Sequence, residues 1–313
     1  MRRISRLALL GLVLSPALAA EDVRQNLVSD GRLLEIHVSD QFSETSRQHL
    51  VEWITTLSGA LRTIYGHWPR RHWQTVISPA PANGDDPIPW AEVQRGKIDS
   101  VKFYVSPTAG SEELKRAWTG YHEFAHLLIP YQGRGDSWFT EGLASYYQNV
   151  LQARSGVIDE QAMWQKLYDG YQRGLADTRF HGRPLGEVSR GMRQEGGFMR
   201  VYWSGAWYFL AADVRLRQQS RGRLSLDKAL EQLNRCCADD SLSVPDIVRK
   251  LDELNRVILF KSLYDELVVS TEIPAYEPIF ASLGISVKGG KVQLQQQGPG
   301  VLIRGGIASG DAL

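Results

Sequence analysis

Two segments that lie close together in the sequence constrain the fold of this chain more than any other feature. Residues 121–126 read YHEFAH, within a stretch whose apolar spacing predicts one helix over 112–129. Because His122 and His126 are four residues apart, a helix places both imidazoles on one face, where they can bind one metal ion. Glu123 is offset from His122 by about 100° around the helix, so it can reach a water molecule at the ion without binding the ion.

The second segment, residues 138–147, reads WFTEGLASYY and opens another predicted helix. Pro130 ends the first helix, and a glycine-containing turn joins the two. Helices joined by so short a connection pack as antiparallel neighbours, so Glu141 can face His122 and His126 and complete a site of two histidines and one carboxylate. The fourth coordination position then stays open for water, which is typical of a catalytic metal site.

Together the two segments resemble the gluzincin metallopeptidases of the aminopeptidase N and glycyl aminopeptidase families, in which HExxH is followed by a W-x-x-E-G-x-A-S/T-Y helix. Residues 202–205 (YWSG) and 222–227 (GRLSLD) resemble two further segments of the glycyl aminopeptidase family. The resemblance covers about residues 100 to 285. It implies a thermolysin-like zincin catalytic region that hydrolyses peptide bonds.

The resemblance also implies a separate role for each site residue. His122, His126 and Glu141 are expected to hold one Zn²⁺ per chain, which lowers the pKa of its bound water towards roughly 7. Glu123 is expected to serve as general base and then acid. Tyr202 maps to the tyrosine that stabilises the oxyanion, although it lies among aromatic residues that are also typical of a core.

Two features depart from the family pattern. The connection between His126 and Glu141 is shorter than in the relatives, and the upstream G-x-M-E-N strand, whose glutamate binds the free amine of an aminopeptidase substrate, is not found. Glu92 occupies about the right place for that amine anchor. Within the peptidase interpretation, cleavage at the end of a peptide and cleavage within it both remain open. The alternative to an enzyme is a non-catalytic binding or scaffold protein with the zincin fold.

Apolar periodicity predicts an α+β, mainly helical fold with a small N-terminal α/β part over residues 20–110. A helix is predicted over 46–65, and the strand nearest the site, 101–105, is expected to be an edge strand that binds peptide by strand addition. A helical catalytic part follows over 111–257, then a C-terminal helix and Gly-rich β tail over 258–313. Three strands are predicted in the first part, over 33–38, 73–77 and 100–105. Further helices are predicted over 137–154, 159–174, 198–219, 226–233, 244–257 and from Pro274 to 283, with short strands around Val292 and Val301 whose role stays open.

The first nineteen residues have the pattern of a cleaved signal peptide, with three arginines, an apolar run too short to span a bilayer and an Ala-Leu-Ala cleavage site. We therefore expect a periplasmic or secreted protein without a membrane span in the mature chain. Loss of Arg2, Arg3 and Arg6 would change the formal net charge from +1 to −2. A chain with this charge lacks the excess of positive charge that binding to a nucleic-acid backbone requires. The expected partner is a peptide or protein substrate, and the oligomeric state stays open.

Cys236 and Cys237 are the two cysteines of the chain, and they are adjacent. Neighbouring Cα atoms lie about 3.8 Å apart, below the usual disulfide range of about 4.4 to 6.8 Å. Buried thiols are therefore favoured over a disulfide, and neither cysteine has a metal-binding spacing.

Overall fold

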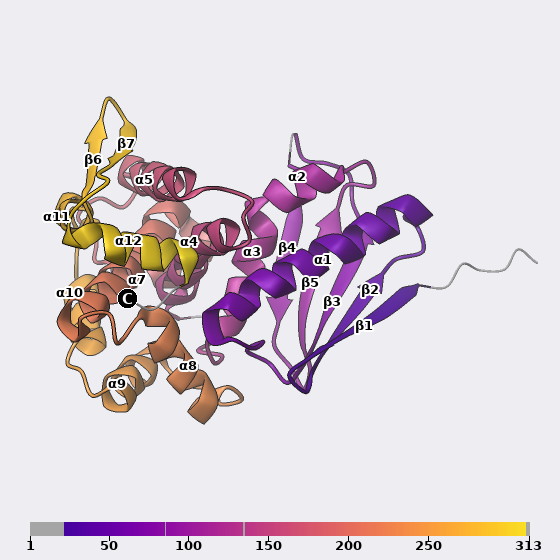
Figure 1. Ribbon diagram of the computed structural model, residues 1–313, viewed down its shortest axis with the longest axis horizontal. Helices are drawn as coiled ribbons and strands as arrows, with labels where there is room; N and C mark the ends of the chain where they lie inside the picture. Colours follow the sequence, from indigo (N-terminus) through magenta and orange to yellow (C-terminus); the bar gives the residue numbers. More distant parts are fainter. Residues whose placement is uncertain (1–21, 85, 134, 311–313) are drawn as a thin grey trace, which may run out of the picture.

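The computed structural model describes residues 22–84, 86–133 and 135–310, in which a sheet region and a helical region lie side by side (Figure 1). The predicted signal peptide lies outside the described residues. The α+β, mainly helical class predicted from the sequence is confirmed. In the described ranges, no helix is both long enough and apolar enough to span a membrane.

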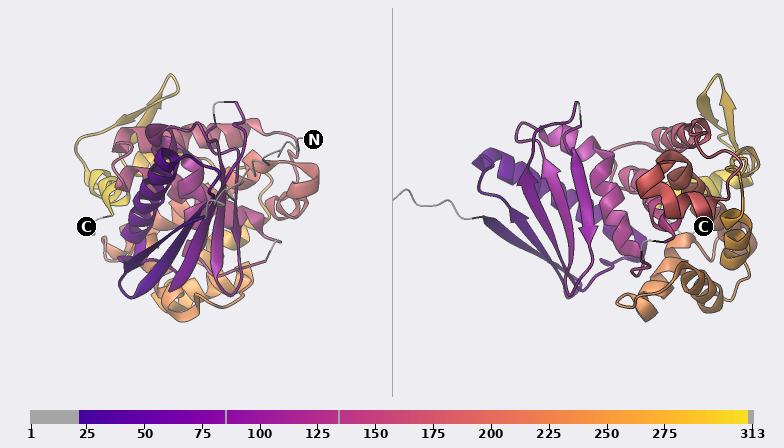
Figure 2. Two further views of the ribbon diagram at one scale, coloured as in Figure 1. Left: turned by 90° about the vertical axis from the view of Figure 1, so that its right-hand side faces the viewer. Right: turned by 180° about the vertical axis from the view of Figure 1, so that it is seen from behind.

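The sheet region contains five strands in the order β1-β2-β3-β5-β4, with β2, β3 and β5 parallel at its centre. Helix α1 (Glu44–Tyr65) connects β2 to β3 and packs along one face of the sheet (Figure 2). Alternate residues of β2 (Leu34, Ile36 and Val38) are fully buried on that face, as period-two patterning requires. The three predicted strands and this helix are confirmed. The strands are β1 (Val23–Ser29), β2 (Arg32–Val38), β3 (His72–Pro79), β4 (Trp90–Gln94) and β5 (Asp99–Val105).

The edge strand next to the helical region is β4, which pairs antiparallel with β5. The prediction that 101–105 forms the edge was therefore wrong, since β5 is paired on both sides. Strand β4 was not predicted because it has only five residues, all half-buried or exposed, and therefore lacks the alternation that marks a one-sided strand.

The helical region contains the remaining helices and a small hairpin. Predicted helices α4, α5, α7, α8, α9 and α11 are confirmed within a few residues, whereas α6 and α10 were missed. The elements are α2 (Ser111–Arg116), α3 (Trp118–Ala125), the 3₁₀ turn η1 (His126–Leu128), α4 (Ser137–Arg154), α5 (Glu160–Ala176), α6 (Leu185–Glu195), α7 (Phe198–Ser220), α8 (Leu226–Cys237), α9 (Val244–Asn255), α10 (Phe260–Val268), α11 (Glu277–Ser282), β6 (Ile285–Lys288), β7 (Lys291–Leu294) and α12 (Pro299–Ser309).

The single helix predicted over 112–129 is divided into α2, α3 and η1. The extended backbone of Ala117 (φ −61°, ψ 124°) separates α2 from α3, and η1 follows α3 directly at His126. The apolar periodicity continues across the break and does not reveal it. The bend is accompanied by close packing of α3 on α1 at Gly120. A Cβ atom at Gly120 would lie 2.6 Å from Leu57 Cδ1 and 2.7 Å from Trp53 Cζ2, so only glycine fits there.

Helices α4 and α7 cross with their backbones in direct contact. A Cβ atom at Gly142 would overlap the Cα of Gly205 and lie 2.9 Å from the backbone nitrogen of Ala206. A Cβ atom at Gly205 would overlap the carbonyl oxygen of Trp138. The two glycines therefore set the separation of the helices that carry Glu141 and Tyr202.

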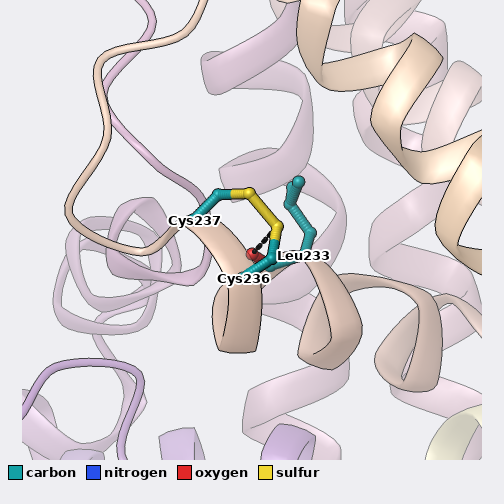
Figure 3. Close-up of a disulfide and its surroundings, with 3 residues drawn as sticks. All are labelled: Leu233, Cys236 and Cys237. Carbon is teal, nitrogen blue, oxygen red and sulfur yellow. Dashed lines mark hydrogen bonds between the residues drawn. A yellow bond between two sulfur atoms is a disulfide. The ribbon is translucent and has the colours of Figure 1, made fainter.

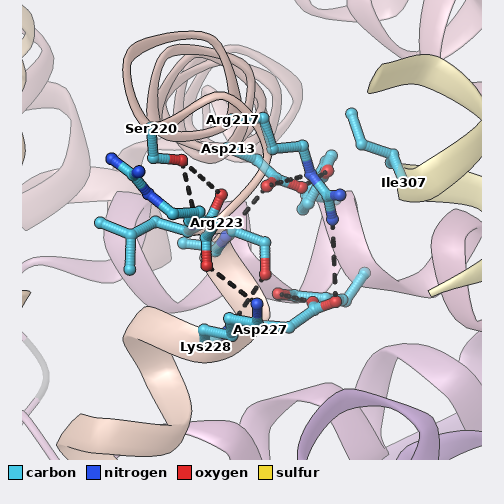
Figure 4. Close-up of polar contacts among 12 residues, drawn as sticks. Asp213, Arg217, Ser220, Arg223, Asp227, Lys228 and Ile307 are labelled. Carbon is cyan, nitrogen blue, oxygen red and sulfur yellow. Dashed lines mark hydrogen bonds and ion pairs between the residues drawn. The ribbon is translucent and has the colours of Figure 1, made fainter. Parts of the chain in front are cut away.

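A buried polar network holds the far half of α4 against α7, α8 and α12 (Figure 4). The Tyr146 hydroxyl donates to Asp213 (2.9 Å), which also accepts from Arg217 Nε (2.9 Å). The Tyr147 hydroxyl donates to Asp227 (2.7 Å). Arg154 donates to Asp227 (2.8 Å) and to the carbonyl oxygen of Ile307 on α12 (3.0 Å). Each buried carboxylate thus faces an arginine and a tyrosine, as buried charges require.

The C-terminal part differs from the predicted β tail. Val292 lies in the hairpin β6–β7 as predicted, but Val301 lies in helix α12, so the strand predicted around it was wrong. Pro299 occupies the first turn of α12, where its missing N–H costs nothing. The glycines in this segment lowered its apparent helix propensity.

Cys236 and Cys237 form a disulfide in the last turn of α8, so the prediction of thiols was wrong (Figure 3). Their Cα atoms lie 3.7 Å apart. The usual range of Cα separations describes cysteines that are distant in sequence, whereas adjacent cysteines close a ring through their own peptide bond. The Cys236 sulfur also lies 3.3 Å from the carbonyl oxygen of Leu233.

The crossing of α4 and α7 predicts the effect of adding one methyl group. Gly205→Ala should lower the free energy of unfolding by about 2–3 kcal/mol, because the new Cβ meets backbone atoms that cannot rotate away. Gly59→Ala is the matched control, because it lies within α1 with open space around its Cβ position and should stabilise by up to about 1 kcal/mol. Denaturant unfolding measures both, and equal effects of the two substitutions would contradict the close crossing.

Candidate metal centre

The structure brings the five predicted site residues together from four elements, α3, η1, α4 and α7. His122 and Glu123 lie on α3, and His126 follows as the first residue of η1 with helical backbone angles (φ −58°, ψ −24°), so both imidazoles stay on one face. Glu141 comes from α4 and Tyr202 from α7.

The imidazoles of His122 and His126 converge on one carboxylate oxygen. Glu141 Oε2 lies 3.2 Å from His122 Nε2 and 3.8 Å from His126 Nε2. Two imidazole nitrogens and one carboxylate oxygen at these separations are the donors that a catalytic zinc site uses, so the residues present fit zinc.

Glu123 also lies near both histidines, with a carboxylate oxygen and one nitrogen from each ring all within 4.8 Å of one another. Two carboxylates are therefore near the imidazoles. Glu141 Oε2 hydrogen-bonds His122 Nε2 and also faces His126 Nε2, so this carboxylate oxygen lies between the two rings.

Burial and mutual charge shift the pKa of each group. Burial raises the pKa of Glu123 to about 7, and the nearby carboxylates of Glu141 and Glu92 add to this rise against the effect of His122. Burial lowers the pKa of His126 to about 4, so this imidazole is neutral, as metal binding requires.

The other two site residues form a charge-assisted pair. Burial acts to lower the pKa of His122, but its hydrogen bond and charge interaction with Glu141 raise it overall. Burial likewise acts to raise the pKa of Glu141, but the hydrogen bond from His122 and the electrostatic interaction with the two imidazoles bring it down to about 2. Glu141 is therefore an ionised acceptor facing the two rings.

Gln148 orients His122 from the side opposite Glu141. His122 Nδ1 lies 2.9 Å from Gln148 Oε1, and both side chains are buried. Since an amide oxygen accepts only, Nδ1 carries a proton in this contact, so Nε2 is the nitrogen that can bind a metal ion once it gives up the proton that it donates to Glu141. The sequence analysis missed Gln148, although it lies seven residues after Glu141 and thus on the same face of α4.

Two arginines hold the end of the metal-binding helical segment. Arg95 donates to the carbonyl oxygen of His126, and Arg95 and Arg70 both donate to that of Ile129 (3.2 and 2.9 Å). Asp99 pairs with both guanidinium groups, at 2.8 and 3.0 Å. Positive charge at the carboxyl end of a helix is favourable, so these contacts fix the turn that carries His126.

Tyr202 lies beside the ligands rather than in the core. Its ring stacks on that of His122, with centroids 6.0 Å apart and planes 21° apart. Burial and the nearby carboxylate of Glu141 raise the pKa of the Tyr202 phenol. The hydroxyl therefore stays protonated and remains a donor.

Glu92 lies on β4, the edge strand beside α3, and its charge contributes to the raised pKa of Glu123. The structure thus places this residue near the site.

Comparisons with known proteins agree with this geometry. A family model described as M61 glycyl aminopeptidase matches residues 131–205, a range that includes Glu141, Tyr202 and both crossing glycines. No curated protein sequence matches the chain significantly.

Solved structures match most of the chain. An aminopeptidase N family protein from Idiomarina loihiensis is 16% identical, with a TM-score of 0.63 over 86% of this chain and 50% of that one. An M1 zinc metallopeptidase from Deinococcus radiodurans is 17% identical, with a TM-score of 0.53 over 82% and 52%. This chain has the fold of M1 zinc metallopeptidases. It spans about half the length of these structures.

The contact between Gln148 and His122 predicts an effect on metal affinity. Gln148→Met should weaken zinc binding about 10- to 100-fold, because His122 loses the acceptor that fixes its proton on Nδ1. Gln152→Met, one turn further along α4, removes a buried amide that contacts the Arg116 carbonyl instead and should leave zinc affinity unchanged. Competition with a chelating dye measures both, and equal zinc affinities would refute the orienting role of Gln148.

Proposed function

We propose that this chain is an exported zinc-dependent peptidase in which His122, His126 and Glu141 hold one zinc ion. The observation that carries the proposal is the convergence of both Nε2 atoms on Glu141 Oε2. Bound zinc supplies a Lewis acid that polarises a carbonyl group and lowers the pKa of water.

Glu123 handles the protons of the reaction. Its carboxylate takes a proton from the attacking water and then gives that proton to the leaving amine, so one residue serves as base and acid. Its pKa of about 7 supports this assignment, because such a carboxyl group can accept and return a proton near neutral pH.

Tyr202 stabilises the negative charge that develops on the carbonyl oxygen. Its hydroxyl is a protonated donor held beside Glu141 and therefore beside the proposed metal position. A hydrogen-bond donor that is already in place before the reaction stabilises this charge without having to reorient as the charge develops.

The edge strand β4 binds the peptide main chain. Its outer side carries no strand among the described residues, and it lies next to α3, so a substrate can add to the sheet in extended form. Glu92 on this strand is the proposed anchor for a free substrate amine, and its use distinguishes an aminopeptidase from an endopeptidase.

Export to the periplasm or the exterior belongs to the same proposal. It rests on the signal-like pattern of the first nineteen residues, and the disulfide between Cys236 and Cys237 supports it, because disulfides persist in oxidising compartments. The alternative, a non-catalytic zincin-fold scaffold, would have no need for Glu123, whose carboxylate lies beside the ligands without being one.

The proposal predicts different effects for the two site glutamates. Glu123→Gln should keep zinc but lose about a thousandfold in kcat on mixed peptide substrates, because both proton transfers depend on this carboxylate. Glu141→Gln should instead lose zinc, because an amide is a poorer ligand than a carboxylate.

The control is Glu112→Gln, which alters an exposed carboxylate on α2 and should change neither quantity. Elemental analysis and peptide hydrolysis are measured on the same preparations. Near-normal hydrolysis by Glu123→Gln would exclude the assigned role, and a zinc-loaded parent that cleaves no peptide would favour the scaffold alternative.

A further inference from the structure

Two exposed aromatic side chains stand beside the site on different helices. Trp118 is the first residue of α3 and is 46% exposed, and Phe198 is the first residue of α7 and is 43% exposed. Each precedes a site residue by four positions, His122 and Tyr202 respectively. Residues four apart lie on one face of a helix, so each aromatic ring lies one turn from a side chain of the reaction centre.

The four rings form a continuous series. Trp118 packs edge to face on His122 with centroids 5.5 Å apart, and His122 stacks on Tyr202 at 6.0 Å. Tyr202 in turn contacts Phe198 edge to face at 6.4 Å. The two inner rings carry the proposed ligand nitrogen and the oxyanion donor, whereas the two outer rings are open to solvent. An apolar group held beside the reacting atoms would therefore contact one of the outer rings.

Ordinary surface exposure does not explain this arrangement. Single exposed apolar residues are common on protein surfaces, but these two come from separate helices and converge on the same pair of functional rings. A large aromatic ring left about half-exposed keeps apolar surface that a ligand can still cover. Together the two rings give the site an apolar boundary on the His122 side and on the Tyr202 side.

We propose that Trp118 and Phe198 are specificity-determining residues, and that the substrates are peptides with bulky apolar or aromatic side chains next to the scissile bond. This inference rests on the proposed peptidase function. An extended peptide whose scissile carbonyl lies between His122 and Tyr202 places one flanking side chain towards each outer ring. Trp118 contacts the side chain on the His122 side, and Phe198 contacts the one on the Tyr202 side.

The test measures binding separately from hydrolysis. Zinc-loaded full-length Glu123→Gln protein is titrated calorimetrically with two peptides that are identical except for phenylalanine or glycine on both sides of the central bond. The phenylalanine peptide should bind at least tenfold more tightly. Adding Trp118→Ala or Phe198→Ala should each reduce that preference about five- to tenfold while zinc content stays the same.

The matched control is Tyr131→Ala. Tyr131 is comparably exposed (41%) but follows the opposite end of the same helical segment, so its loss should leave the preference unchanged. Trp118→Leu is measured beside Trp118→Ala, because it keeps an apolar side chain at the start of α3 if alanine destabilises the helix. It should retain part of the preference.

Two results would overturn the inference. One is a parent that binds both peptides equally, and the other is a preference for phenylalanine that survives in both ring variants. Hydrolysis of the phenylalanine peptide by the unsubstituted protein is measured in parallel. Its absence would refute the peptidase function, whereas the binding comparison would still decide the role of the two rings.

Discussion

The contact between the backbones of α4 and α7 at Gly142 and Gly205 determines the geometry of the site. Side chains usually keep packed helices 8–10 Å apart, and a Cβ at either glycine would overlap the other helix. Glu141 immediately precedes one glycine, and Tyr202 lies three residues before the other. The close crossing therefore places a carboxylate and a phenol near each other, beside His122 and His126. The same two glycines explain why E-G and Y-x-x-G occur in these segments.

The rest of the helical region keeps that crossing in register. Beyond Gly142, the tyrosines of α4 donate to Asp213 on α7 and Asp227 on α8, and Arg154 joins the end of α4 to α12. Removing one member would leave a buried charge without its partner, which is strongly destabilising, so these contacts favour one arrangement of α4 over shifted ones. At the other side of the site, Arg70 and Arg95 fix the turn that carries His126. The sheet region thus contributes the arginines and the edge strand, and the helical region contributes Glu141 and Tyr202.

Local signals in the sequence were sufficient to predict α4 with its correct ends and the approach of Glu141 to His122 and His126, because helical spacing and a short turn leave few arrangements. Tyr202 was expected beside them only from the family resemblance. Features that depend on tertiary contacts were not predictable in this way. The edge strand β4 is too short to show alternation, and the break at Ala117 lies within an unbroken apolar pattern. Gln148 looks like any polar helix residue until His122 is placed opposite it. Helix α12 was not predicted because its glycines have low helix propensity. The disulfide between Cys236 and Cys237 was not predicted because the usual range of Cα separations describes cysteines that are distant in sequence.

The central claim is that the α4–α7 crossing places Glu141, and not Glu123, as the third ligand of a zinc ion. X-ray diffraction from crystals of the zinc-loaded chain, recorded on both sides of the zinc absorption edge, tests it most directly. The account predicts one anomalous peak per chain, within about 2.0–2.2 Å of both histidine Nε2 atoms and of a Glu141 carboxylate oxygen. A peak bound by Glu123 in place of Glu141, or no peak between the histidines, would contradict it.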